Sequence, residues 1–210
     1  MSGAFITLEG IEGVGKSTNL DFVEQRLAAA GHRTVVTREP GGTSLGERVR
    51  EWVLEGEHQM LSAEVESLLM FAARAHHLDM VIRPALSQGR WVICDRFTDA
   101  TLAYQGGGRG ASITWLETLK AAVQRDLEPH LTLLLDAPVE VGRARIVNRT
   151  PDHFEREDPE FFERVRATYL KVARENPERV KMIDATQSLT TVQNALAKQV
   201  DAFVQRFEAA

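Results

Sequence analysis

The residues best suited to chemistry lie near the N-terminus, where Gly10-Ile11-Glu12-Gly13-Val14-Gly15-Lys16-Ser17 matches the pattern G-x-x-x-x-G-K-[ST]. Glycines at this spacing let the backbone curl with its N–H groups pointing inward, which forms an anion site at the positive end of the following helix. In such a loop the lysine reaches the β- and γ-phosphates of ATP, and the serine hydroxyl binds Mg²⁺. We therefore expect ATP to bind residues 10–18, which include Thr18, with Lys16 catalytic and Ser17 a metal ligand.

A phosphate loop does not by itself separate a GTPase, an ATPase motor and a small-molecule kinase. No N-K-x-D guanine-recognition motif occurs in the chain, and 210 residues leave little room for the coupling domains of a motor. A kinase whose acceptor is itself phosphorylated needs a second anion site facing the loop. Arg38 and Arg96 can supply one, because the guanidinium fork matches the geometry of phosphate.

Five short apolar runs and the segments between them predict the elements that position these residues. The runs cover residues 5–8, 34–37, 91–94, 131–135 and 180–183, and each is short enough for a buried strand. Apolar residues at helical spacing occupy 19–30, 63–87, 113–126, 161–174 and 189–207. This alternation predicts an α/β fold with a parallel five-stranded sheet and helices on both faces.

Polar residues follow every run, beginning with Glu9, Arg38, Asp95, Asp136 and Asp184. Ligands of parallel sheets bind beyond the carboxyl ends of the strands, so these residues are expected to gather at one edge, beside the phosphate loop. An ordinary alternative stays open for each of them, because polar residues commonly follow a strand as it reaches the surface.

Composition and charge exclude several classes of protein. The net charge of −5 gives no overall attraction to nucleic acid or to an anionic membrane, and no stretch approaches the roughly 18 apolar residues that span a bilayer. Cys94 is the single cysteine, so no intrachain disulfide can form. We expect one cytoplasmic domain over residues 1–210 that binds neither nucleic acid nor membranes.

Further motifs extend along the chain: Thr37-Arg38-Glu39-Pro40-Gly41-Gly42-Thr43, Phe71-Ala72-Ala73-Arg74, Asp95-Arg96-Phe97, Ala103-Tyr104-Gln105-Gly106-Gly107-Gly108-Arg109-Gly110 and Ile183-Asp184-Ala185-Thr186. With the phosphate loop, these motifs closely resemble those of the bacterial thymidylate kinases over nearly the whole chain. The resemblance implies a P-loop kinase fold, a homodimer formed through helices, and transfer of the ATP γ-phosphoryl group to thymidine monophosphate (dTMP).

The resemblance also implies roles for individual residues around the acceptor phosphate. Arg38 and Arg96 match the residues that hold this phosphate, and Arg96 joins Lys16 among the candidate catalytic residues. Asp95 matches a carboxylate close to Mg²⁺ and is therefore expected, with Ser17, to be a metal ligand.

The sugar and base of dTMP have their own expected partners. Glu12 matches the carboxylate that accepts a hydrogen bond from the 3′-hydroxyl, and Arg74 matches the arginine that binds the thymine carbonyl edge. Thr101, Tyr104 and Gln105 are expected to line the base and sugar, with the Tyr104 ring excluding a 2′-hydroxyl. The ordinary alternatives are a solvated loop acid at Glu12, a surface helix charge at Arg74, a plain helix hydroxyl at Thr101 and a packing role for Tyr104.

One departure from the family pattern concerns the residue that covers the thymine ring. The family commonly has a phenylalanine four residues before the arginine, where this chain has Met70. Phe71 follows, and both positions share the helical face of Arg74. We favour Phe71 because an aromatic ring can stack on the base.

A second departure concerns a lid expected at about residues 142–158. The phosphate loop contains no arginine, which resembles the variant of the family that supplies catalytic charge from a basic lid. Arg145 and Arg149, at helical i,i+4 spacing, are the candidates, and His153 stands where close relatives carry an arginine. An arginine delivered by lid closure would stabilise the charge of the transferring phosphoryl group.

Two rival functions remain open at this point. One is a kinase for another monophosphate, such as uridylate or adenylate, although the adenylate-type loop G-x-P-G-x-G-K is absent. The other is a nucleotide-binding regulatory module that has lost turnover, against which the intact set of Lys16, Ser17, Arg38, Asp95 and Arg96 argues.

Overall fold

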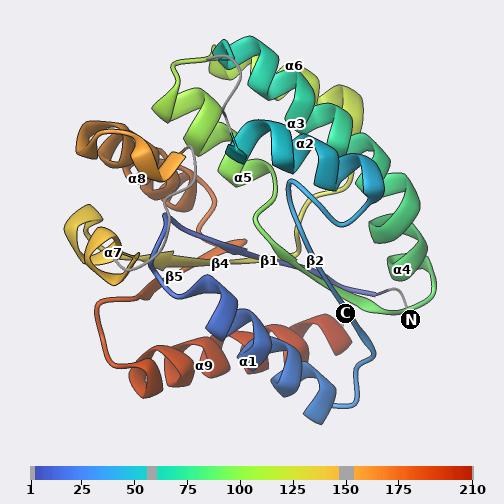
Figure 1. Cartoon of the computed structure of the whole chain (residues 1–210). Helices are drawn as coiled ribbons and strands as arrows, with labels where there is room; N and C mark the ends of the chain where they lie inside the picture. The colour runs from blue at the N-terminus through green and yellow to red at the C-terminus, as the bar shows by residue number, and fades with distance from the viewer. Residues whose placement is uncertain (1–2, 56–60, 147–153, 210) are drawn as a thin grey trace.

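The computed structural model describes residues 3–55, 61–146 and 154–209. Within these ranges, strands form one parallel sheet in the order β2-β3-β1-β4-β5 (Figure 1). The strands are β1 (Phe5–Glu9), β2 (Thr34–Arg38), β3 (Trp91–Asp95), β4 (Leu131–Asp136) and β5 (Val180–Asp184). The predicted α/β fold with a parallel five-stranded sheet is confirmed.

Each strand is one residue longer than the apolar run that predicted it, because the polar residue after the run still pairs in the ladder. Arg38 lies beside Asp95, and Asp136 lies beside Asp184. The outer strands β2 and β5 are partly exposed, whereas the sequence predicted buried strands. An edge strand has a neighbour on one side only, so the layers of helices cover it incompletely.

All five predicted helical segments are present, but one of them is interrupted, and further helices lie between them. The helices are α1 (Lys16–Ala29), α2 (Ser44–Glu55), α3 (Ala63–His77), α4 (Arg83–Ser87), α5 (Thr98–Thr101), α6 (Ile113–Gln124), α7 (Val139–Ile146), α8 (Pro159–Glu175) and α9 (Leu189–Glu208). The stretch expected as one helix over 63–87 contains the π-helical turn η1 (Leu78–Ile82) between α3 and α4. Helix α2 was not expected, although its apolar residues Leu45, Val49, Trp52 and Val53 have helical spacing.

Helices α1 and α9 cover one face of the sheet, and α3 to α6 with α8 cover the other (Figure 1). Alternation along β1 places Phe5, Thr7 and Glu9 on the second of these faces. Phe5 packs with the apolar residues of η1, while Thr7 and Glu9 carry polar groups into the interior beneath α8. No helix in the described part of the chain is long and apolar enough to cross a membrane.

Candidate active site

The phosphate loop forms the start of the site, between β1 and α1. Gly15 adopts a left-handed conformation with φ of 90° at the beginning of α1 and provides no side-chain cap. The Lys16 ammonium lies back over the loop and donates to the carbonyl oxygens of Gly10 at 2.9 Å and Ile11 at 2.7 Å. Burial, followed by the nearby charge of Arg96, lowers the pKa of Lys16 to about 8.

Members of the expected ATP-binding segment differ in exposure. Ser17 and Thr18 are exposed on the first turn of α1, whereas Ile11 and Val14 point into the core and fix the loop from below. The side chains of Ser17 and Thr18 are therefore accessible to a ligand at the positive end of α1.

Arg96 and Tyr104 converge on the carboxylate of Glu12. The Arg96 guanidinium donates to Glu12 Oε1 at 2.7 Å, and the Tyr104 hydroxyl lies 2.8 and 2.7 Å from the two carboxylate oxygens. Burial alone would raise the pKa of Glu12, but the charges of Arg96 and Lys16 and the Tyr104 hydrogen bond outweigh it and hold the pKa below its usual value. Glu12 is thus an ionised carboxylate, part of whose hydrogen-bonding capacity is already taken within the protein.

The Arg74 guanidinium is buried and held on several sides. Its Nε donates to Glu39 Oε2 at 2.7 Å, and its Nη2 donates to Thr101 Oγ1 at 2.9 Å. The rings of Phe71 and Phe97 lie 4.8 and 4.9 Å from its central carbon. Its Nη1 is buried without a hydrogen-bond partner, which leaves one fixed donor for a carbonyl oxygen.

These groups line one cavity beside the phosphate loop. Its lining includes six of the predicted substrate residues, namely Glu12, Arg74, Arg96, Thr101, Tyr104 and Gln105. Met70 also lines the cavity, whereas Phe71 does not and packs against Arg74 instead. This placement favours Met70 over Phe71 as the side chain that faces a bound base, because only Met70 is directed towards the cavity.

The two arginines expected at the acceptor phosphate differ in their position relative to the cavity. Arg96 lines the cavity, but Arg38 is half exposed and pairs with Glu47 at 2.8 Å outside the lining. Arg50 of α2, which the sequence analysis missed, lines the cavity, and burial together with the charges of Arg38 and Arg96 lowers its pKa. Prediction of α2 would have found it, because Arg50 lies three and four residues before Val53 and Leu54 and so shares the inward face of that helix.

Glu39 is a second residue of the cavity that the sequence analysis did not assign. Its buried carboxylate bridges Arg74 and His77, whose Nδ1 lies 2.9 Å from Glu39 Oε1. His77 in turn lies 2.7 Å from Thr37 Oγ1. The sequence shows this carboxylate inside a motif of glycines and an arginine. It does not show that the partner of the carboxylate is Arg74, which lies 35 residues away along the chain.

The polar residues at the other strand ends are divided between the site and the surrounding structure. Asp95 Oδ1 is buried without a hydrogen-bond partner, which suits a carboxylate that meets a cation. Asp136 is bound by Arg166 at 2.8 and 2.9 Å, and Asp184 accepts from the Thr186 amide. Asp136 and Asp184 therefore fit the ordinary alternative, in which a polar residue follows a strand as it reaches the surface.

Helix α7 carries the beginning of the expected lid to the phosphate loop. A Cβ on Gly13 would lie 2.0 Å from the carbonyl oxygen of Gly142, so the two backbones can meet only because Gly13 lacks a side chain. One turn further, Arg145 Nη1 donates to the Ala185 carbonyl at 2.9 Å and lies 3.5 Å from that of Gly13. Arg149 and His153 lie outside the described residues.

A parallel sheet with a phosphate loop, beside a cavity lined by Arg50, Arg74 and Arg96, defines a P-loop kinase with a separate site for an anionic acceptor. A model of the family described as thymidylate kinase matches residues 8–196. The chain therefore belongs to the thymidylate kinase family.

Individual relatives agree with this assignment over almost their full length. The chain is 56% identical to the thymidylate kinase of Methylococcus capsulatus, covering 96% of this chain and 97% of the relative. It is 54% identical to that of Pseudomonas putida, covering 98% and 99% respectively. The crystal structure of thymidylate kinase from Ehrlichia chaffeensis superposes with a TM-score of 0.77 at 34% identity, covering 95% of this chain and 99% of that one.

Proposed function

We propose that this chain, a dTMP kinase with ATP as its phosphoryl donor, works with Mg²⁺ and through the residues gathered around the phosphate loop. The observation that carries the assignment of residues is the cavity in which Arg74 is held by the buried Glu39 and Arg96 by the partly buried Glu12. Arg74 Nη1 supplies a fixed donor for the base carbonyl, and Arg96 lies beside the loop where the acceptor phosphate must meet ATP.

The residues have separate tasks in phosphoryl transfer. Lys16 turns from the loop carbonyls to the β- and γ-phosphates of ATP, while Arg96, with Arg38 and Arg50, holds the dTMP phosphate whose oxygen attacks. Mg²⁺ would neutralise the phosphate oxygens, held by Ser17 and Asp95 and otherwise by phosphates and water. The absence of any cluster of three or more His, Cys, Asp or Glu ligands from the described ranges agrees with this mode of binding.

Substrate identity is tested by a coupled assay of ADP release with dTMP, UMP and AMP as acceptors. We expect the highest kcat/KM with dTMP, because Arg74 and Thr101 present groups that fit the carbonyl edge of a pyrimidine rather than adenine, and the Tyr104 ring excludes the 2′-hydroxyl of UMP. Equal or higher kcat/KM with UMP or AMP would assign the enzyme to another monophosphate. ATP binding without ADP release for any acceptor would identify a regulatory module.

Replacement of Tyr104 by alanine is expected to weaken discrimination against a ribose substrate. The buried ring lines the cavity and packs at centroid distances of 5.4 Å from Phe154 and 6.2 Å from Phe161, so it cannot easily move away from a 2′-hydroxyl. We expect kcat/KM for ribothymidine monophosphate, relative to dTMP, to rise at least about tenfold, within the range of small steric discriminations.

Tyr104→Phe is the matched control for this prediction. It keeps the ring but removes the hydroxyl that bonds to Glu12, so activity falls while the ratio of the two substrates stays near the wild-type value. An unchanged ratio in Tyr104→Ala would make Tyr104 a packing residue and place the sugar filter elsewhere.

We further propose that the chain acts as one kinase domain over residues 1–210, with a lid at about 142–158, in a cytoplasmic homodimer. Exposed apolar side chains on α2, α3 and η1 support a second copy as the partner. They include Trp52, 70% exposed, Leu68, 51% exposed, and Met80, 62% exposed. Such residues on neighbouring elements are typical of an interface between subunits.

Leu68→Glu is accordingly expected to convert dimers to monomers, because it places a charge in the apolar face of α3. Sedimentation velocity measures the change. Leu189→Glu is the matched control: Leu189 is also 51% exposed, but it lies on α9 at the opposite face of the sheet. A monomeric wild-type protein, or a Leu68→Glu variant that remains dimeric, would contradict this interface.

A further inference from the structure

The backbone at Arg96 is in an unfavourable conformation. Its φ angle is +67°, in the left-handed region that residues with a side chain seldom adopt. Residues in this region are retained where the surrounding structure holds them, and they are frequent at functional sites. At this position the chain leaves β3 and turns towards α5, and the turn directs the guanidinium to the phosphate loop.

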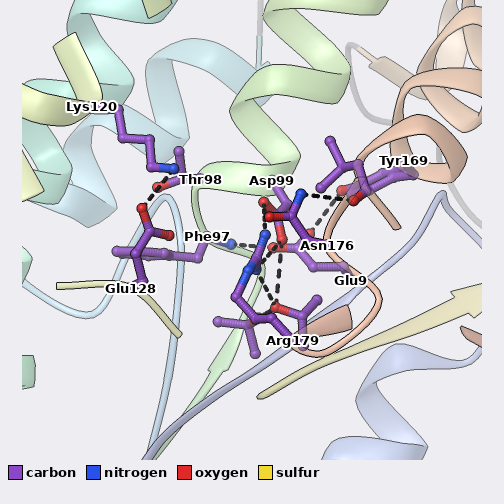
Figure 2. A network of polar contacts seen from close by, with 12 residues as sticks. Glu9, Phe97, Thr98, Asp99, Lys120, Glu128, Tyr169, Asn176 and Arg179 are labelled. Atoms are coloured by element: carbon purple, nitrogen blue, oxygen red, sulfur yellow. Dashed lines mark hydrogen bonds and ion pairs between the residues drawn. The ribbon is translucent and has the colours of Figure 1, made fainter. Parts of the chain in front are cut away.

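Three hydrogen bonds hold the peptide groups on either side of this residue. The Arg96 amide donates to the Leu8 carbonyl at 2.9 Å, and the Cys94 thiol donates to the Arg96 carbonyl at 3.0 Å. The next amide, that of Phe97, donates to Glu9 Oε1 at 2.7 Å (Figure 2). Glu9 thus binds the backbone of this strained turn through its carboxylate, and it follows directly after Leu8 on β1.

Glu9 is completely buried, and its other oxygen is also engaged. The Tyr169 hydroxyl lies 2.8 Å from Glu9 Oε2, from α8 on the far side of the carboxylate (Figure 2). Asp99 lies nearby but is held by Arg179 at 2.7 and 3.1 Å. A buried carboxylate is costly to retain, and its geometry here gives it a use in holding the Phe97 amide.

We propose that Glu9 is a positioning residue for Arg96: by fixing the Phe97 amide, it keeps the strained turn in the conformation that directs the Arg96 guanidinium to the acceptor phosphate. This inference rests on the proposed role of Arg96 in binding dTMP. Glu9 itself lines neither the cavity nor the exposed surface of the loop.

The role needs a hydrogen-bond acceptor but no negative charge. Burial, followed by the charge of Asp99, raises the pKa of Glu9 to about 8, and the protonated acid still offers its carbonyl oxygen to the Phe97 amide. Glutamine can make the same bond, and its amide can donate to Tyr169 Oη. Leucine has a similar volume but cannot accept a hydrogen bond.

Steady-state kinetics of Glu9→Leu and Glu9→Gln test the proposal. We expect Glu9→Leu to raise the KM for dTMP about tenfold or more, because misplacement by an ångström at a reacting site is costly, while the KM for ATP changes less than about threefold. Glu9→Gln should restore most of the loss. Tyr169→Phe is the matched control, since it removes the other hydrogen bond of Glu9 and leaves the Phe97 amide bound.

Two further measurements distinguish an error in the proposed role of Arg96 from an error in the positioning role of Glu9. Arg96→Ala tests the role of Arg96 alone: if it leaves the KM for dTMP unchanged, the proposed function of Arg96 is wrong. If Arg96→Ala weakens dTMP binding but folded Glu9→Leu does not, the positioning role of Glu9 is wrong. In case Glu9→Leu does not fold, hydrogen exchange of the Phe97 amide in the wild type decides: strong protection is expected, and exchange at the rate of an exposed amide would overturn the proposal.

Discussion

Replacing Lys16 by alanine is expected to lower kcat by about 100-fold or more while leaving the fold intact, because a fixed charge at the transferring phosphates acts mainly in the transition state. Within the described part of the chain, the ammonium group donates hydrogen bonds to carbonyl oxygens of the phosphate loop and lies outside the apolar core. Far-UV circular dichroism should therefore remain native, and the loss should appear in kcat rather than only in KM.

Lys198→Ala is the control for a lost lysine charge, since Lys198 is exposed on α9 at the opposite face of the sheet. Its kcat should equal that of the wild type. A fall of less than about tenfold in Lys16→Ala, which corresponds to about 1.4 kcal/mol of transition-state stabilisation, would contradict the role given to Lys16.

The second large effect is expected at the base of the lid. Arg145→Ala should lower kcat on the order of 100-fold with little change in dTMP binding, because the phosphate loop has no arginine of its own to stabilise the transferring group. Arg145 is placed for this by the close approach of α7 to Gly13, which brings its guanidinium beside the loop. Single-turnover kinetics with calorimetry of dTMP binding separates the two quantities.

Arg143→Ala provides a matched control on the same helix. Arg143 is exposed and donates to the Glu157 carbonyl at 3.1 Å, away from the phosphate loop, so its loss should have little effect on kcat. If only Arg149→Ala lowers kcat strongly, the result supports a basic lid and makes Arg149, rather than Arg145, the catalytic arginine. Normal kcat in both Arg145→Ala and Arg149→Ala would contradict the basic lid.

The sequence alone determined the sheet, the phosphate loop and most of the helices. These features depend on local patterns: short apolar runs make buried strands, and glycines before Lys16 make an anion site whatever the rest of the chain does. The rule that ligands of a parallel sheet bind at the carboxyl ends of its strands then placed Arg96 and Asp95 beside the loop, and the structure has them there.

Other features depend on which side of an element faces the cavity, and spacing along the chain did not settle them. Met70 and Phe71 share the helical face of Arg74, yet only Met70 lines the cavity, because Phe71 packs on the guanidinium itself. Arg50 was missed because α2 itself was not predicted, and the packing of α2 against α3 brings Arg50 to the cavity. In each case a tertiary contact decided the outcome.

The buried polar contacts needed the tertiary structure most of all. Glu9 ends an apolar strand and looks like a residue reaching the surface, but it is enclosed by Tyr169, 160 residues away, and binds the amide of Phe97, 88 residues away. A sequence specifies that a carboxylate follows a strand. The packing of α8 over β1 excludes water from that carboxylate. Its hydrogen bond then fixes the turn at Arg96, because no water competes with the Phe97 amide for the buried acceptor.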